Sequence, residues 1–318
     1  MFALVRTVAL PMGMAISAAV GMAAPAVAQD FPTRAIEYII PFNPGGESDV
    51  TARLQEPLLK EALGVDVNVR HQPGGGGAVA WSEFQSNAEA DGHEIIGINL
   101  PHIVGQPIQR ADAGYSTEGF DIITWFHFTP HVLIVPASSP FQTLDDLVSF
   151  ATENPQAVTM GGSGTFSGNH LETLRFEELA EVDVTYIPFT GTGPLPAAIL
   201  GGHVGSVMSN STLGVQMGDQ VRVLAVAADE RLEVLPDVPT FKEQGYDIVG
   251  GTFRGVAAPK GTPADRVTML ADVFTEINET LGERQIPMGF QMTDIRGDDA
   301  VALLDRLKTQ YGPYLEGN

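Results

Sequence analysis

Short apolar runs rich in β-branched residues alternate along this chain with longer amphipathic stretches. This alternation is typical of βαβ units, in which helices connect the strands of a mainly parallel sheet. A first series of units predicts strands at 36–41, 65–69 and 94–98. Helices are predicted between these strands at 49–62 and from 78 through 84.

A second series begins near His131. It predicts strands at 132–135, 158–160, 184–188, 204–208, 221–226 and 253–258. Thr143 is predicted to cap a helix, with Asp146 at its third position, where a carboxylate stabilises the positive helix end. Two more helices are predicted, one after Pro263 and one at about 298–308.

The two series follow each other without a flexible tether, which predicts two α/β lobes joined by crossing strands. We predict that lobe one comprises residues 30–130 together with 253–318, and that lobe two comprises residues 131–252. Small ligands commonly bind in clefts of this kind. The pattern therefore predicts a ligand cleft between the two lobes.

Residues 1–28 have the features of a secretory signal peptide. Arg6 supplies a positive charge, residues 8–20 are apolar and small, and Ala26-Val27-Ala28 fits an A-x-A cleavage site. The alternative is a membrane anchor, but Pro11 interrupts the run, which is shorter than the ~20 residues of a spanning helix. We expect a periplasmic protein that begins at Gln29 and has no direct membrane insertion after cleavage.

Charge and cysteine content narrow the possible partners. The chain has 17 Lys and Arg, 39 Asp and Glu and no Cys, and without Arg6 its net charge is −23. Such an acidic surface repels nucleic acid and anionic lipid, so we expect no nucleic-acid partner. The absence of cysteine excludes thiol catalysis and cysteine-ligated metals.

Three loops rich in glycine and hydroxyl groups each follow a predicted strand and precede a helix: 41–49, 161–168 and 189–193. Glycine lets the backbone approach a ligand closely, and a helix start exposes unpaired N–H groups with partial positive charge. Together these features can bind an anion without a basic side chain. A single loop of this type is often structural, and Ser48 or Asp49 can cap the helix. Three such loops together indicate a carboxylate site.

Enzyme and metal signatures are incomplete. The G-x-S-x-G elbow fails around Ser163 because Thr165 replaces the last glycine, and no lysine follows a glycine as a P-loop requires. Residues 75–80 match G-x-G-x-x-A, but Pro73 stiffens the turn that a dinucleotide site needs. We predict no enzymatic activity, no cofactor and no metal.

Two other features have structural interpretations. His127 and His131 have the spacing of a helical zinc pair, but Pro130 between them opposes a helix. Both are expected at strand ends or in the core. Arg254 lies near the predicted lobe junction, where we favour an ion pair with one of the many acidic residues over contact with ligand.

Nine segments occur in the order found in a known family. They are Pro32-Thr33-Arg34, PFNPGGESDVTARL (41–54), NVRHQPGGGG (68–77), Asp91-Gly92-His93, SPFQTLDDL (139–147), GSGTFSGNHL (162–171), IPFTGTGPLPAAILGGHVG (187–205), LPDVPTFKEQGYD (235–247) and FRGVAAPKGTP (253–263). Over nearly the whole mature chain, the sequence resembles the Bug-type receptors of tripartite tricarboxylate transporters. It departs at His71, where the family often has Asn, and at Gly205, where it often has Asp.

The resemblance implies a periplasmic-binding-protein fold whose two lobes close, like a Venus flytrap, on a small di- or tricarboxylate-like ligand. It also implies the membrane subunits of a tripartite transporter as partners. The loops matching 42–49 and 163–167 would bind the carboxylate from opposite lobes. The predicted ligand contacts are Phe42, Asn43, Gly45, Gly46, Ser48, Asn99, Ser163, Gly164, Thr165, Ser167, Thr190, Gly191, Thr192 and Asn210. A periplasmic enzyme acting on carboxylated substrates and a receptor for a membrane sensor kinase remain alternatives.

Overall fold

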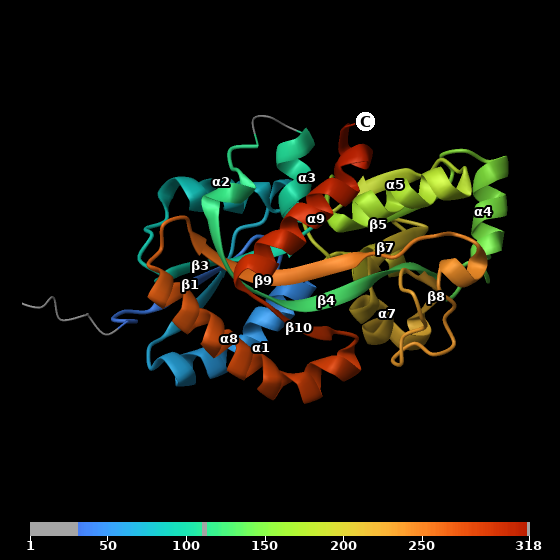
Figure 1. The fold of residues 1–318 in the computed structure, drawn as a ribbon. Coiled ribbons are helices and arrows are strands. Elements are labelled where there is room, and N and C mark those ends of the chain that lie inside the picture. The colour runs from blue at the N-terminus through green and yellow to red at the C-terminus, as the bar shows by residue number, and fades with distance from the viewer. Residues whose placement is uncertain (1–30, 110–112, 317–318) are drawn as a thin grey trace, which may run out of the picture. The chain divides into compact units, whose positions relative to one another are not determined.

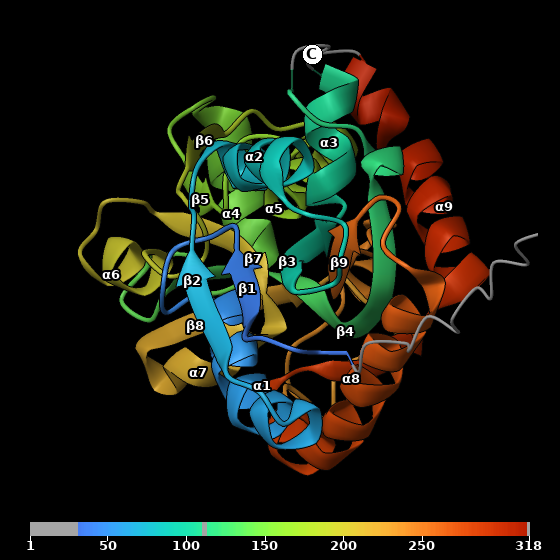
Figure 2. The same cartoon turned by 90° about the vertical axis from the view of Figure 1, so that its left-hand side faces the viewer.

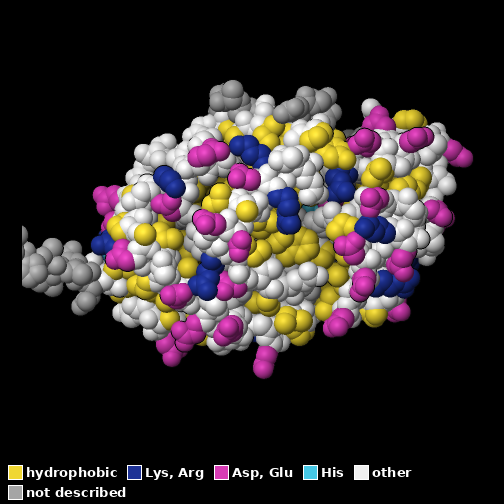
Figure 3. All heavy atoms as spheres, viewed as in Figure 1, with side chains coloured by type: hydrophobic (Ala, Val, Ile, Leu, Met, Phe, Trp, Pro, Cys, Tyr) yellow, Lys and Arg dark blue, Asp and Glu magenta, His cyan; other side chains and the backbone are white. Residues whose placement is uncertain are grey.

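The computed structural model describes residues 31–109 and 113–316. The predicted signal segment at 1–28 lies outside the described residues. None of the helices within the described ranges combines the length and apolar character needed to cross a bilayer. Acidic side chains are spread over the face shown in Figure 3 and outnumber Lys and Arg there, as the composition leads one to expect.

Strands and helices alternate in the first part of the described chain, as the hydrophobic pattern predicts. In order they are β1 (Ile36–Ile40), α1 (Glu47–Leu63), β2 (Val67–His71), a 3₁₀ turn (Gly75–Gly77), α2 (Ala78–Asn87), β3 (Glu94–Leu100), α3 (His102–Gln109) and a second 3₁₀ turn (Thr117–Gly119). Helix α1 begins two residues before its predicted start. The pattern does not predict α3, which is short and contains Pro107.

The 17-residue strand β4 (Phe120–Pro136) is shared by two pairing regions. Its first part pairs antiparallel with β9 (Gly251–Pro259) and β10 (Gln291–Ile295). From His131 onward it pairs antiparallel with β7 (Ser206–Asn210) and β8 (Val221–Val226). The sequence pattern predicts only residues 132–135 of β4, where the apolar residues are continuous. Polar residues and Pro130 interrupt the apolar residues of its first part.

The other elements complete the two pairing regions (Figure 1). They are α4 (Leu144–Glu153), β5 (Thr159–Gly162), α5 (Gly168–Ala180), β6 (Thr185–Pro188), α6 (Leu195–Leu200), α7 (Ser211–Met217), α8 (Ala264–Gln285) and α9 (Gly297–Glu316), with 3₁₀ turns at Gly218–Gln220, Lys242–Gln244 and Ile286–Met288. The main pairing path is β2-β1-β3-β9-β4-β7-β5-β6, and β8 and β10 each pair with β4. The predicted lobe bounds stay a prediction; the change of partners along β4 falls at Pro130 and His131.

Helices cover both faces of each pairing region, because successive strand residues point to opposite faces. In β1, Tyr38 packs in a core with α1 and α8, whereas Ile39 packs in another with α2, α3 and α9. Figure 2 shows α2 and α3 on one side of β1–β3 and α1 and α8 on the other. In β4, Leu133 faces a core with α4 and α5, and Ile134 faces one with α6 and α7.

The capping box predicted at the start of α4 is confirmed. The Thr143 hydroxyl accepts from the Asp146 N–H at 3.1 Å, and the Asp146 carboxylate accepts from the Thr143 N–H at 2.9 Å. These bonds pair donors that a helix start otherwise leaves unpaired, and they hold the pKa of Asp146 below its usual range.

We expect Thr143→Ala to lower the free energy of unfolding by about 1 kcal/mol, the usual loss for an N-cap hydroxyl. Urea denaturation followed by circular dichroism measures it. Thr152→Ala, an exposed interior position of the same helix, is the matched control and should change stability by less than about 0.5 kcal/mol. Equal losses in both variants would show that the cap contributes nothing.

Candidate functional site

Strand ends and helix starts from both pairing regions meet at a small polar hollow, here called the inner cavity. Ten residues line it: Phe42, Gly46, Glu47, Ser48, Asn99, His102, Ser163, Thr192, Asn210 and Arg254. All but Glu47, His102 and Arg254 belong to the predicted ligand contacts. The hollow has a volume of about 10 Å³, roughly the room that one water molecule needs.

The start of α1 forms one wall of the inner cavity. Gly46 is the N-cap residue, and no side chain caps the helix. Because α1 begins at Glu47, Ser48 and Asp49 are its second and third residues, and the prediction that one of them caps the helix is wrong. The Ser48 hydroxyl instead lies 3.4 Å from both side-chain polar atoms of Asn99, the residue before the end of β3.

Asp49 stabilises the loop that leads into α1. One carboxylate oxygen accepts from the Gly45 N–H at 2.8 Å, and the other lies 2.6 Å from Nε2 of His71. Asp49 lines neither of the hollows at the site. Its position explains how a turn with two consecutive glycines keeps one shape beside the hollow, which Gly46, Glu47 and Ser48 line. The N-terminus of a helix can stabilise an anion.

The first and third predicted loops pack directly on each other. The Asn43 N–H donates to the Thr190 carbonyl at 3.3 Å, and the Glu47 N–H donates to the Thr192 hydroxyl at 3.3 Å. A Cβ atom on Gly193 would lie 2.5 Å from the Pro44 carbonyl oxygen. The backbones can approach this closely because position 193 has no side chain. The third loop therefore packs directly against the first.

Ser163 belongs to a buried hydrogen-bond network behind the cavity. Nδ1 of His102 accepts from the Gly168 N–H at 3.3 Å, and Nε2 lies 3.1 Å from the Ser163 hydroxyl. Burial holds the pKa of His102 well below its usual range, with the charge of Arg254 adding to the effect. The neutral ring must therefore carry its proton on Nε2 and donate to Ser163. Ser163 in turn donates to the side-chain carbonyl of Asn169.

A buried ion pair between Glu47 and Arg254 lines the inner cavity. Arg254 donates one Nη to the Glu47 carboxylate and the other to the Thr129 hydroxyl at 2.7 Å. Glu47 also accepts from the Asn210 amide and, at 2.7 Å, from the Thr212 hydroxyl. The prediction that Arg254 pairs with an acid is confirmed, and Arg254 also lines the cavity. Sequence reasoning missed Glu47, because an acid in a first helical turn already has a dipole role.

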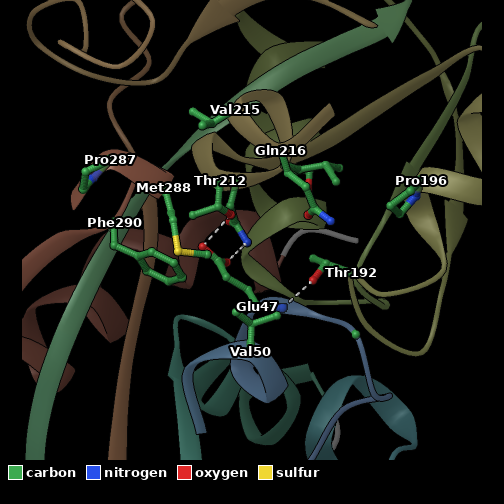
Figure 4. Close-up of a pocket in the computed structure, with 14 residues that line it drawn as sticks. Glu47, Val50, Thr192, Pro196, Thr212, Val215, Gln216, Pro287, Met288 and Phe290 are labelled. Carbon is green, nitrogen blue, oxygen red and sulfur yellow. Dashed lines mark hydrogen bonds between the residues drawn. The ribbon is translucent and has the colours of Figure 1, made fainter. Parts of the chain in front are cut away.

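A second and larger hollow adjoins the first and is here called the outer cavity (Figure 4). Its volume is about 220 Å³. It shares Glu47, Thr192 and Asn210 with the inner cavity, and its other lining residues are Gly45, Val50, Pro196, Ser209, Thr212, Leu213, Val215, Gln216, Pro287, Met288 and Phe290. Sequence reasoning missed this hollow, because α7 and the 286–290 turn have no motif that connects them to the glycine loops.

The other predicted contacts lie elsewhere. Gly164, Thr165 and Thr190 line a separate hollow with Gly75 and Gly76, outside both cavities. Ser167 caps α5, accepting from the His170 N–H at 3.2 Å. Asn43 and Gly191 lie at the contact between the first and third loops and line neither cavity. The structure thus brings about half of the predicted contacts together at the inner cavity. It places Gly164, Thr165 and Thr190 in another hollow.

Two buried histidines that line neither cavity lie in the protein core. His127 and His131 lie on β4 with no exposed side-chain surface, which confirms their predicted place in the core. His127 contacts Gln285 at 3.0 Å, and His131 lies between Glu172 and Thr252 at 3.0 Å from each. Within the described ranges, no group of three or more His, Asp and Glu side chains could hold a metal ion.

The architecture and the site between its two regions define the class of two-lobe periplasmic solute-binding proteins, and the predicted fold class is confirmed. The model of the tripartite tricarboxylate transporter family receptor matches residues 51–292, and the chain belongs to this family. Protein BugT of Bordetella pertussis is 29% identical over 278 residues, which cover 86% of this chain and 84% of BugT.

Two solved structures from Rhodopseudomonas palustris are similar over most of both chains. MatC with bound malate has a TM-score of 0.81 and 25% identity, covering 90% of this chain and 99% of its own. A protein with adipate has a TM-score of 0.80 and 26% identity, covering 90% of this chain and 96% of its own. The predicted resemblance to Bug-type receptors is confirmed.

Two buried histidines and the half-buried His170 should make the protein less stable in weak acid. Burial lowers the pKa of His102 well below 6.5, of His127 to about 3 and of His170 to about 4. Since these values are depressed in the folded state, the unfolded chain binds the extra protons. Stability should therefore fall as the pH drops below about 6.5, by up to ~1.4 kcal/mol per pH unit for each histidine.

His170→Gln tests this effect, because it removes one of the three groups. Between pH 6.5 and pH 4.5, urea titrations should give a shallower loss of stability for the variant than for the parent, by the uptake of about one proton. His203→Gln, at an exposed position, is the control and should keep the parental slope. Parallel curves for His170→Gln and parent would contradict the assignment.

Proposed function

We propose that this protein captures a small carboxylate in the periplasm and delivers it, chemically unchanged, to the membrane subunits of a tripartite tricarboxylate-type transporter. The observation that carries the proposal is the inner cavity, where the start of α1, the side chains of Ser48 and Asn99 and the guanidinium of Arg254 converge. Helix N–H groups and a guanidinium are the groups that bind carboxylates most strongly in proteins.

Several properties of the cavity support an anionic ligand. The Nε–H of Arg254 has no hydrogen-bond partner among the described residues, although its side chain is 97% buried. A buried donor of this kind is costly unless a ligand or water pairs with it. The carboxylates malate and adipate are bound by two structural neighbours. The family role supports the transporter subunits as partners.

Binding requires the loops to separate. A carboxylate does not fit into a hollow of about 10 Å³, which has room for roughly one water molecule. The contacts of Asn43 with Thr190 and of Glu47 with Thr192 connect the proposed lobes, residues 30–130 with 253–318 and residues 131–252. Opening breaks these bonds together with others between the proposed lobes, such as those of Glu47 with Asn210 and Thr212. A hinge-type closure would then bring the loops together around the ligand.

The hydrogen bonds around Ser163 support binding without turnover. A serine nucleophile needs a base that accepts its proton. Nε2 of His102 instead carries a proton, because Nδ1 accepts from the Gly168 N–H. The Ser163 proton is directed to the Asn169 carbonyl. The pair therefore lacks the activated arrangement of a hydrolase.

The proposed function also requires export of the chain to the periplasm. The A-x-A site at 26–28 and the apolar segment before it support export and cleavage before Gln29. An intact mass of the periplasmic protein that matches a chain beginning at Gln29 is expected. A mass that still includes residues 1–28 would refute the cleavage site.

Thermal-shift measurements against mono-, di- and tricarboxylates test the function directly. A ligand at 100 times its Kd should add ~2.7 kcal/mol of stability. Mass spectrometry of the incubated ligand should show an unchanged mass. Failure of every carboxylate to stabilise the protein would overturn carboxylate binding, and a changed ligand mass would favour an enzyme.

Gly46→Val tests the position of the ligand. A Cβ at this residue would lie 3.1 Å from Thr192 Oγ1 and 3.2 Å from the Gly193 nitrogen, so a branched side chain holds the loops apart and covers the first-turn N–H groups. Losing one hydrogen bond to a charged group should weaken binding about ten- to a hundredfold. Isothermal titration calorimetry with a ligand found in the screen measures the change.

Gly205→Val is the matched control, because a Cβ there meets its nearest neighbour at 3.6 Å and the residue lines neither cavity. It should bind as tightly as the parent. If Gly46→Val is folded and also binds like the parent, the ligand does not lie at the start of α1.

A further inference from the structure

The residues that line the outer cavity indicate the chemistry of the ligand beyond its first carboxylate. It adjoins the inner cavity through Glu47, Thr192 and Asn210, so a ligand anchored at the start of α1 extends into it. Half of its lining consists of apolar side chains, including Val50, Leu213, Met288 and Phe290. Apolar surface of this kind favours an apolar ligand body, since its burial is favourable.

Charge in the outer cavity is one-sided. Among the described residues that line it, Glu47 alone carries a charge, and that charge is negative. Its side-chain oxygens point into the cavity toward Thr212 (Figure 4). A second ligand carboxylate placed here would face a like charge in a partly desolvated space, where repulsion is strong.

Arg254 does not compensate a second carboxylate. It lines the inner cavity and not the outer one, and its two Nη groups already donate to Glu47 and Thr129. The nearest basic side chains on α1, those of Arg53 and Lys60, are about half exposed or more and line neither cavity. The distal end of a ligand therefore meets no positive charge among the described residues of the outer cavity.

One buried polar group in the outer cavity remains available. Ser209 is fully buried, and its hydroxyl has no hydrogen-bond partner among the described residues. A buried hydroxyl of this kind can pair with a neutral ligand group, such as a hydroxyl or ether oxygen. It cannot by itself offset the charge of a carboxylate.

We propose that this receptor selects monocarboxylates with an apolar aliphatic or aromatic body, and that Glu47 excludes ligands with a second carboxylate. The proposal rests on the proposed function, because it places the first carboxylate in the inner cavity. It replaces the di- or tricarboxylate class expected from the family resemblance with monocarboxylates. It also separates this chain from the neighbours that bind malate and adipate.

Calorimetry with matched ligand pairs tests the proposal. Hexanoate is compared with adipate, and benzoate with terephthalate, so that each pair differs only in the second carboxylate. At neutral pH the parent should bind the monocarboxylate of at least one pair more than about tenfold tighter than its dicarboxylate, because like charges would be juxtaposed in the latter. Equal or tighter binding of the dicarboxylates would overturn the proposal and leave carboxylate binding intact.

Glu47→Gln should shift the ratio of the two affinities by about tenfold toward the dicarboxylate, since the repelling charge is removed. The ratio is the readout, because the variant also frees Arg254 and so raises the affinity for both ligands. Glu61→Gln, an exposed position on α1, removes the same net charge and should keep the parental ratio. An unchanged ratio in Glu47→Gln would contradict the role of Glu47.

Gln216→Lys provides an independent test if Glu47→Gln does not fold. Gln216 is exposed and lines the outer cavity, so a lysine is tolerated there and supplies the missing positive charge. The variant should bind the dicarboxylate at least about tenfold tighter than the parent does. No gain in dicarboxylate binding would overturn the proposal. Failure of all four ligands and of the wider carboxylate screen would instead refute the proposed function.

Discussion

The buried ion pair between Glu47 and Arg254 is the contact on which the site depends. It joins the start of α1 to β9, and through Asn210 and Thr212 it connects the first pairing region to β7 and α7. Removing two charges from water is costly, and their attraction offsets this only when further hydrogen bonds complete the arrangement. Here Thr129, Asn210 and Thr212 supply those bonds. Through Glu47, the pair therefore holds the start of α1 against β7 and α7.

The strongly acidic composition makes this local arrangement necessary. A chain with a net charge of −22 repels anions at a distance. An anion can bind only where short-range dipoles and a paired guanidinium outweigh that field. In the proposed site this place is the start of α1, where Gly46 lets the Thr192 loop approach and Asp49 fixes the turn. Electrostatic screening by salt should therefore help the encounter more than it weakens the bound state.

The sequence predicts much of the fold because its strands are short apolar runs rich in β-branched residues and its helices are amphipathic with a period of 3.6 residues. Strand β1, the capping box at Thr143 and the α/β order all follow from local pattern. The pattern does not predict β10 or the first half of β4, since the pairing that stabilises them is long-range. The glycine loop at 41–49 identifies Gly46 and Ser48 as site residues for a local reason, a helix start after a strand. The Glu47–Arg254 pair and the lining residues from α7 could not be predicted from local pattern. Glu47 and Arg254 are 207 positions apart, so only folding brings them together.

A crystal structure of the protein with a bound monocarboxylate tests the central claim most directly. The account predicts both carboxylate oxygens within hydrogen-bond distance of the first-turn N–H groups of α1 and of the Ser48 or Asn99 side chain. It also predicts that Glu47 remains paired with Arg254 and that the apolar body extends past Met288 and Phe290. A carboxylate found instead beside Thr165 and Gly76, or one that replaces Glu47 on Arg254, would contradict it.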